Sequence, residues 1–415
     1  GAFLSGGVDS STIVALMQAQ SDRPVQTFTI GFKEANFDES PHAAAVAKHL
    51  GTDHVKMRVT ESDARDVIPI LPKLYDEPFA DSSQIPTYLV CSAARKHVTV
   101  AISGDGGDEL FGGYNRYIRG PGLWHRISGM PSTVRHLAIQ TAQRIPEYSW
   151  DMFGAIYNKV RTGNTGISNL GTKVHRLCER LHLTESLDDL HFNMASTWVK
   201  PEEVIRENIN EPLSQFKDPL PIIAEKDPVM QMMVQDMRSY LPDDILCKVD
   251  RAAMGISLET RTPFLDRTWV NYYLSLPMKL RYSKDDPEKY LIRKAFDEEH
   301  FKNRENKSLL PSSILWRRKE AFSDGVSSGK TTTREIIYKH IHDLDNHEQL
   351  VSLFENYRID NRENINEVIK KCEQTKNISH LLPETLEQFY YRYIFELYYR
   401  GSGKVIPYFW MPNYV

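Results

Sequence analysis

Short apolar runs alternate with amphipathic stretches over the first 117 residues of the chain. The apolar runs are typical of buried strands, and the stretches between them have helical spacing. The predicted strands are residues 2–4, 25–30, 54–59 and 98–102. The predicted helices are residues 10–20, 41–50, 61–74 and 86–96. Strands joined through helices form a mostly parallel sheet with helices on both faces, and such sheets bind ligands at the carboxyl ends of their strands.

From about residue 118 the apolar positions recur at helical spacing instead. Clear examples are residues 132–144, 228–240 and 384–399. We therefore expect an α/β core over residues 1–120, followed by a mainly helical part of the same domain over residues 121–415. These helices are expected to wall in a site on the sheet.

The composition is that of a folded globular protein. Apolar residues make up 41% and charged residues 26% of the 415 residues, a length that suits two or three packing units. Lys and Arg number 51 and Asp and Glu number 55, so the net charge of −4 gives no overall attraction to nucleic acid. No apolar run approaches the ~18 residues that a membrane-spanning helix needs, so we expect no membrane contact and a cytoplasmic location.

The cysteines and the first residue bear on the context of the chain. Cys91, Cys178, Cys247 and Cys372 form neither a CxxC pair nor a zinc-ligand spacing. We therefore expect free thiols in a reducing compartment. The chain begins at Gly1 within an apolar run, so we expect that a further segment of the natural protein precedes it.

The first predicted strand leads into a loop rich in glycine and serine, residues 5–11 (SGGVDSS), and then into a helix. Glycines let a ligand approach the backbone closely, and the N–H groups at a helix start attract phosphate. Asp9 could then hold a magnesium ion on the phosphate oxygens. The alternative is a tight turn in which Asp9 or Ser10 caps the helix. The full run at the end of the first strand favours the phosphate site.

The fourth predicted strand ends in a second glycine-rich loop, residues 103–114, which contains Asp105, Asp108 and Glu109. Three carboxylates so close together repel one another unless solvent or a cation neutralises them. A solvated acidic turn is the alternative interpretation. Because the carboxyl ends of parallel strands share one edge of the sheet, we expect this loop to lie beside residues 5–11 and to complete a pocket for ATP and magnesium.

Four separated segments resemble, in the same order, the synthetase domain of glutamine-hydrolysing asparagine synthetases. They are residues 5–11, 103–114, 241–266 and 316–326. The first segment alone would indicate only the wider group of ATP pyrophosphatases. The resemblance implies an adenine nucleotide alpha hydrolase-like, Rossmann-like fold. It also implies that ATP adenylates aspartate with release of pyrophosphate, and that ammonia then attacks to give asparagine and AMP.

The resemblance implies roles for individual residues of the two loops. The expected pyrophosphate contacts are Ser5, Gly6, Gly7, Asp9, Ser10 and Ser11. The expected adenosine contacts, partly through backbone groups, are Leu4, Ile30, Ser103 and Gly104. Asp9 and Asp108 are the expected Mg²⁺ ligands. Asp105 and Glu109 belong to the expected catalytic set, although Asp105 stands where several members of the family have glutamate.

The third and fourth segments supply further expected site residues. Lys319 matches the family lysine that contacts the phosphates in the transition state, and by its sequence alone it also fits a solvated surface charge. Asp250, Arg251, Glu259 and Arg261 could orient the amino-acid substrate or a helix of the active site, and Arg261 is assigned to the catalytic set. A buried structural ion-pair network is an equal alternative for these four.

Two departures from the family bear on the substrates. The loop at residues 76–86 lacks an arginine that lies near the substrate in some asparagine synthetases, and it resembles a branch that includes amidotransferases for sugar acids of surface polysaccharides. The run KEAFSDG at residues 319–325 favours aspartate, so a sugar acid is the alternative substrate. The family's glutaminase domain is missing from this sequence. We therefore expect ammonia as the nitrogen donor of this chain, glutamine as that of the full-length enzyme, and a possible homodimer.

Overall fold

A computed structural model describes ten stretches of the chain. They are residues 1–31, 38–76, 79, 81, 83–160, 170–182, 184–196, 227–282, 288–297 and 308–317. The described residues form two compact units. The first unit contains Gly1–Gly113 and the described residues from Asp236 onward, and the second contains the described part of Tyr114–Gln235.

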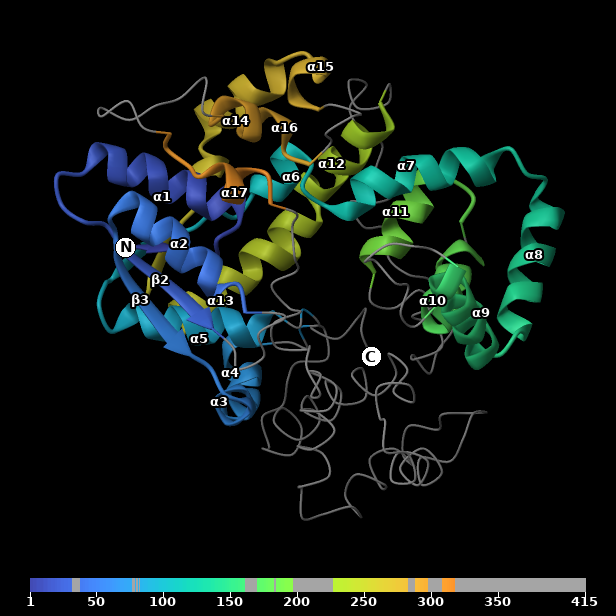
Figure 1. Ribbon diagram of the computed structural model, residues 1–415, viewed down its shortest axis with the longest axis horizontal. Coiled ribbons are helices and arrows are strands. Elements are labelled where there is room, and N and C mark those ends of the chain that lie inside the picture. The colour runs from blue at the N-terminus through green and yellow to red at the C-terminus, as the bar shows by residue number, and fades with distance from the viewer. Residues whose placement is uncertain are drawn as a thin grey trace. The chain divides into compact units, whose positions relative to one another are not determined.

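A five-stranded parallel sheet is the centre of the first unit (Figure 1). Its strands, in spatial order, are β3 (Asp53–Arg58), β2 (Gln26–Gly31), β1 (Ala2–Phe3), β4 (Val100–Ile102) and β5 (Glu259–Arg261). In the register of the sheet Ala2 pairs with both Thr27 and Ile102, and Val100 pairs with Glu259. The predicted α/β class and the four predicted strands are confirmed. The strand β5 was not predicted, because its sequence Glu-Thr-Arg contains no apolar residue.

Helices cover both faces of this sheet (Figure 1). The helices that follow the first strands are α1 (Val8–Gln20), α2 (Ser40–Leu50), α3 (Glu61–Val67), α4 (Leu71–Tyr75) and α5 (Gln84–Arg95). Successive strand residues point to opposite faces. Ala2 and Leu4 accordingly pack with α1 and α2, whereas Phe3 packs into the core beneath α5.

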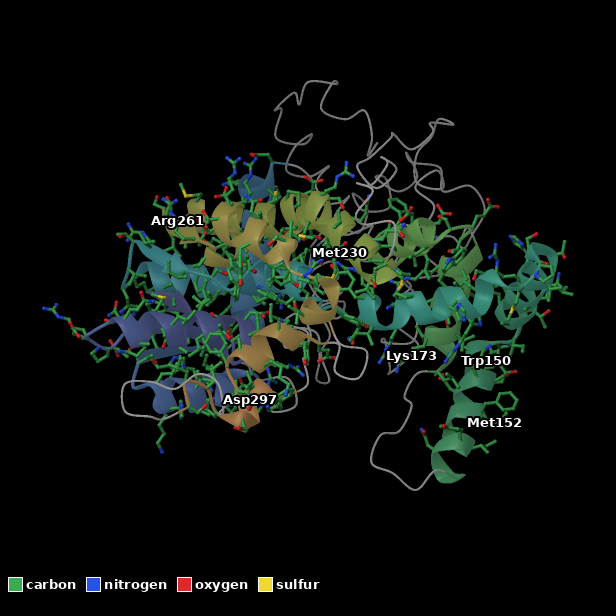
Figure 2. The ribbon with its side chains drawn as sticks, turned by 90° about the horizontal axis from the view of Figure 1, so that it is seen from above. Trp150, Met152, Lys173, Met230, Arg261 and Asp297 are labelled. Carbon is green, nitrogen blue, oxygen red and sulfur yellow. The ribbon has the colours of Figure 1, made fainter. Side chains whose placement is uncertain are left out.

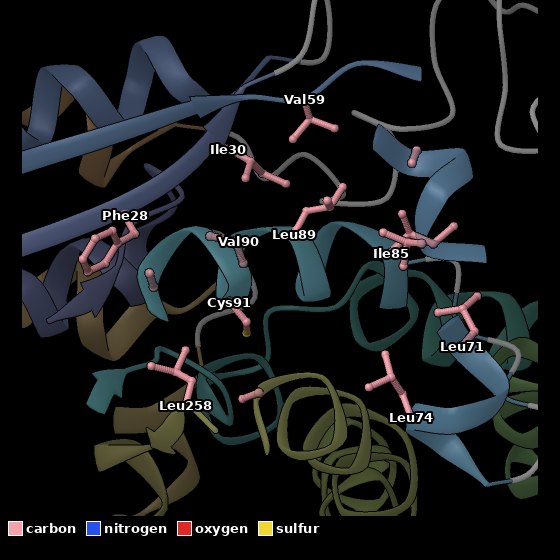
Figure 3. Packing of buried hydrophobic residues seen from close by; sticks show 14 of the residues in the cluster. Phe28, Ile30, Val59, Leu71, Leu74, Ile85, Leu89, Val90, Cys91 and Leu258 are labelled. Atoms are coloured by element: carbon pink, nitrogen blue, oxygen red, sulfur yellow. The ribbon is translucent and has the colours of Figure 1, made fainter. Parts of the chain in front are cut away.

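The core beneath α5 joins the sheet to helices from distant parts of the sequence (Figure 3). Phe28 and Ile30 of β2 lie in it with Leu89 of α5 and with Leu258, which directly precedes β5. The predicted helix at residues 61–74 is interrupted here by a 3₁₀ turn, η1 (Ile68–Ile70). Pro69 and Pro72 explain the interruption, because proline has no N–H for the helical hydrogen-bond ladder.

The rest of the first unit consists of short helices. They are α6 (Gly107–Phe111), the π-helical η3 (Leu241–Leu246), α13 (Cys247–Met254), the 3₁₀ turn η4 (Pro263–Leu265), α14 (Arg267–Ser275), α15 (Met278–Arg281), α16 (Tyr290–Ala295) and α17 (Ser312–Leu315). Phe111 of α6 anchors several of them, because its ring packs edge-on against Phe264 and Tyr273 at centroid distances of 5.4 and 4.8 Å. Ile292 of α16 lies in the same buried cluster.

The second unit is helical in its described residues. Its helices are α7 (Asn115–Ser128), α8 (Ser132–Arg144), α9 (Glu147–Val160), α10 (Leu170–His182), α11 (Leu187–Ala195) and most of α12 (Pro228–Arg238). Figure 2 labels Trp150 and Met152 on α9. The core of the second unit contains Ile127, Ile139 and Leu190. The helices predicted at residues 132–144 and 228–240 are thus present, and the one predicted at residues 384–399 lies outside the described residues.

Two further observations concern the described residues alone. Cys91, Cys178 and Cys247 are free thiols, and Cys372 is outside the described ranges. Within those ranges, no helix combines the length and the apolar character that crossing a membrane requires.

Candidate active site

The two loops singled out in the sequence meet where the strand order reverses. From β1 the chain continues to β2 and β3 on one side, and it then returns to β4 on the other side of β1. Open α/β sheets bind ligands in the crevice at this reversal, beyond the carboxyl ends of the strands. The loops after β1 and β4 lie at this reversal. A Cβ added to Gly104 would lie 2.8 Å from the backbone nitrogen of Ser10, so the two loops are in close contact.

The first loop is tied into one shape by its serines. Ser5 N–H donates to Ser10 Oγ at 3.1 Å, the two hydroxyls are 2.9 Å apart, and Gly7 N–H donates to Ser5 Oγ at 3.2 Å. Gly6 has a φ of 77°, and a Cβ there would lie 2.7 Å from the backbone nitrogen of Ala43. Gly7 caps α1 without a side-chain oxygen, so an anion can take that place at the positive end of the helix dipole.

The second loop holds a half-buried acidic group shortly after β4. Ser103 N–H donates to the carbonyl oxygen of Arg261 at 2.8 Å, and the Ser103 hydroxyl donates to Asp105 Oδ2. Burial raises the pKa of the Asp105 carboxyl, and the hydrogen bond from Ser103 opposes that rise only in part. A carboxyl group with a raised pKa at the carboxyl end of a parallel strand is a candidate functional group.

The carboxylates of Asp9 and Asp108 converge on one lysine. Lys289 Nζ is 2.6 Å from Asp108 Oδ1 and also contacts Asp9 Oδ2. A Cβ added to Gly107 would lie 2.7 Å from Asp9 Cγ, so glycine at this position leaves room for the Asp9 side chain. Burial opposes the charge on Lys289, but the nearby carboxylates of Asp108 and Asp9 outweigh it and raise the pKa of the ammonium group above its ordinary value.

A second buried lysine lies close to the acidic loop. Lys248 on α13 donates to Asp81 Oδ2 at 2.5 Å and to Ser83 Oγ at 2.7 Å, just before the start of α5. Burial raises the pKa of Asp81, but the charge and the hydrogen bond of Lys248 outweigh it, and the net pKa of Asp81 is lowered. The reciprocal effect raises the pKa of Lys248 against burial, with a smaller contribution from Asp105.

Four further predicted site residues, Leu4, Ser11, Ile30 and Glu109, are buried. Leu4 and Ile30, expected to contact adenosine, have their side chains in the apolar cores, so that a contact through their backbone groups is the one compatible with this packing. Ser11 is fully buried in α1. Glu109 is also buried, in α6.

The predicted residues of the third and fourth segments are placed differently. Arg261, labelled in Figure 2, has a side chain that is 69% exposed and paired with Glu259 at 3.1 Å. Arg251 pairs with Asp76 on the surface, and Asp250 is exposed. The described contacts of these residues are therefore solvent-exposed pairs and not a buried ion-pair network. Lys319 lies outside the described residues, so its role stays a prediction.

Sequence reasoning missed both buried lysines. Lys289 joins Asp9 from 280 positions away in the sequence, and no local pattern marks it. Lys248 carries a weak signal, because it lies one helical turn before Ala252 on the buried face of α13. A lysine on an apolar helix face needs a partner, and Asp81 is that partner.

The donor set at Asp9 and Asp108 fits a magnesium ion that is completed by phosphate. Within the described ranges, no group of three or more His, Cys, Asp or Glu side chains converges as a metal cage. Magnesium is, however, commonly held through one or two carboxylates together with substrate phosphates and water. Asp9 and Asp108 supply two carboxylates that already meet at one cation, Lys289, next to the loop that suits a phosphate.

Comparison with known proteins identifies one family. Residues 1–388 match the family model described as asparagine synthase. The chain is 31% identical over 323 residues to asparagine synthetase (glutamine-hydrolyzing) 1 of Bacillus subtilis, which covers 78% of this chain and 46% of that protein. It is 26% identical over 425 residues to asparagine synthetase (glutamine-hydrolyzing) of Gallus gallus, which covers 100% of this chain and 52% of that protein. The chain thus spans about half the length of the curated relatives that it matches.

Proposed function

Because this chain belongs to the asparagine synthase family, we propose that it converts aspartate to asparagine with ATP and ammonia. In the first step a side-chain carboxylate oxygen of aspartate bonds to the α-phosphorus of ATP, and pyrophosphate leaves. In the second step ammonia bonds to the activated carbon of β-aspartyl-AMP, loses a proton, and AMP leaves. Adenylation is needed because a free carboxylate is a poor electrophile.

One observation carries this proposal. Asp9, within the loop of residues 5–11, and Asp108, in the loop after β4, meet at one point. The loop of residues 5–11, which is held by hydrogen bonds of its serines, and the start of α1 would bind the pyrophosphate part of ATP. Asp9 and Asp108 would hold magnesium, which when bound offsets the charge that builds on the phosphates. Lys289 adds a buried positive charge at the same place, and we propose that it interacts with the leaving pyrophosphate. Lys319 stays a further proposed phosphate contact.

The aspartate that accepts the adenylyl group is proposed to lie next to the second loop, residues 103–114. Asp105 and Glu109 are the proposed catalytic carboxylates there, and Ser103 and Gly104 the proposed contacts with adenosine. Arg261 is proposed to orient the amino acid. The loop at residues 76–86 contains no arginine, and this favours a sugar acid as the second candidate substrate.

The setting of the reaction is also a proposal. The names of the relatives specify glutamine hydrolysis. We propose that glutamine supplies the ammonia in a longer protein that includes a glutaminase domain, in the cytoplasm and as a homodimer. The chain in hand is proposed to use free ammonia.

Removal of the Asp9 charge tests the site directly. In Asp9→Asn, release of pyrophosphate should fall about a hundredfold or more, because a ligand for the cation at the transferring phosphates is lost. The circular-dichroism spectrum should be unchanged. Asp22→Asn is the matched control, because Asp22 is exposed just after α1 and should keep full activity. Full activity in Asp9→Asn would place the nucleotide elsewhere.

A further inference from the structure

A lysine ammonium occupies the point at which Asp9 and Asp108 converge. Lys289 Nζ is 2.6 Å from Asp108 Oδ1 and contacts Asp9 Oδ2. The lysine side chain is 5% exposed, compared with 17% and 20% for the side chains of Asp9 and Asp108. Lys289 therefore has the most deeply buried side chain of the three, and its charge is compensated by the two carboxylates.

The backbone around Lys289 is built to hold it there. Its N–H donates to the carbonyl oxygen of Phe111 at 3.1 Å, and its φ of 55° and ψ of 36° lie in the left-handed region. Residues other than glycine seldom adopt these backbone angles, and those that do are often found at functional sites. A Cβ on Gly113 would lie 2.3 Å from Lys289 Cε and 2.0 Å from Asp108 Oδ1, so glycine at position 113 leaves room for the pair.

An ammonium group and a magnesium ion cannot share these oxygens. Magnesium lies about 2.0–2.1 Å from its ligand oxygens. An ion bound to both carboxylates would therefore stand close to the present position of Lys289 Nζ, and two positive charges at that separation repel each other strongly in a buried site. The lysine stem is flexible, so the ammonium group can withdraw when another anion accepts it.

We propose that Lys289 is the resident counter-ion of Asp9 and Asp108 in the nucleotide-free protein, and that it excludes divalent metal from them until phosphate oxygens offer its ammonium group another partner. This inference rests on the proposed function, because it takes the two carboxylates as the magnesium ligands. It follows that metal alone binds weakly to the wild-type protein. It also follows that binding of metal and binding of nucleotide are coupled.

Binding of Mn²⁺ alone tests this exclusion. Lys289→Met removes the resident charge, and Lys294→Met removes one lysine charge from α16, the helix that Lys289 precedes, at a position that is 47% exposed. Electron paramagnetic resonance measures the free Mn²⁺. We expect Lys289→Met to bind Mn²⁺ about tenfold or more tightly than the wild type. Lys294→Met should match the wild type, and equal Mn²⁺ affinity in all three proteins would overturn the proposal.

A second measurement applies if Lys289→Met does not fold in the absence of metal. In that case millimolar Mg²⁺ should restore the folded circular-dichroism spectrum of Lys289→Met, because the divalent ion replaces the missing positive charge. No rescue by Mg²⁺ would overturn the proposal. Neither readout involves turnover. Pyrophosphate release by the wild-type protein therefore tests the proposed function separately, so that a failure of the metal-exclusion proposal can be told apart from a failure of the proposed function.

Discussion

At the scale of the single residue, Asp105 shows a conflict between stability and the proposed chemistry. Its side chain is half-buried after β4, and its hydrogen bond from Ser103 does not fully offset the desolvation of the charged form. A group whose pKa is raised by folding lowers the stability of the folded state as the pH rises from the unfolded-state pKa through the folded-state pKa. A carboxylate kept at such a position is better explained by function than by packing.

Asp105→Asn should separate these two effects. The variant should unfold at a higher temperature than the wild type at neutral pH, because a buried ionisable group is removed. The gain should shrink as the pH falls towards and below about 3.9, because the carboxyl then becomes protonated in the unfolded state as well. Pyrophosphate release should decrease. Thermal unfolding between pH 4 and pH 8 measures the trend, with exposed Asp53→Asn as the control. A gain that is independent of pH would show that folding does not raise the pKa of the Asp105 carboxyl.

At the scale of elements, a buried ion pair joins α13 to the residues just before α5. Lys248 on α13 reaches Asp81 and Ser83 at the start of α5, and the Tyr75 hydroxyl donates to the carbonyl oxygen of Lys248 at 3.2 Å. An exposed pair, Arg251 with Asp76, also links α13 to the end of α4. The two pairs differ mainly in burial, since the Lys248 and Asp81 side chains are 9% and 13% exposed and those of Arg251 and Asp76 are 47% and 66% exposed.

The same substitution in each pair should therefore have unequal effects. Asp81→Asn leaves the buried Lys248 charge without its counter-charge and should lower the free energy of unfolding by about 3–5 kcal/mol. Asp76→Asn breaks the exposed pair and should lower it by less than about 1 kcal/mol. Urea denaturation measures both. Similar losses in the two variants would mean that the Lys248–Asp81 pair is well solvated in solution.

At the scale of the whole molecule, the sequence predicted what depends on local pattern. The apolar runs gave β1 to β4, and the loops after β1 and β4 come together because parallel strands end at one edge of the sheet. The strand β5 has no apolar residue, and it is held by its pairing with β4. Lys289 could not be predicted from local pattern, because its partner Asp9 is 280 positions away and only the fold unites them.

The dependence of pyrophosphate release on aspartate tests most directly whether this chain activates aspartate with ATP. The purified chain is incubated with Mg²⁺, ATP and ammonium, with and without aspartate, and pyrophosphate, AMP and asparagine are quantified. We predict that all three products form only when aspartate is present. Pyrophosphate release that is unaffected by aspartate, or no products from a folded chain that binds ATP, would contradict it.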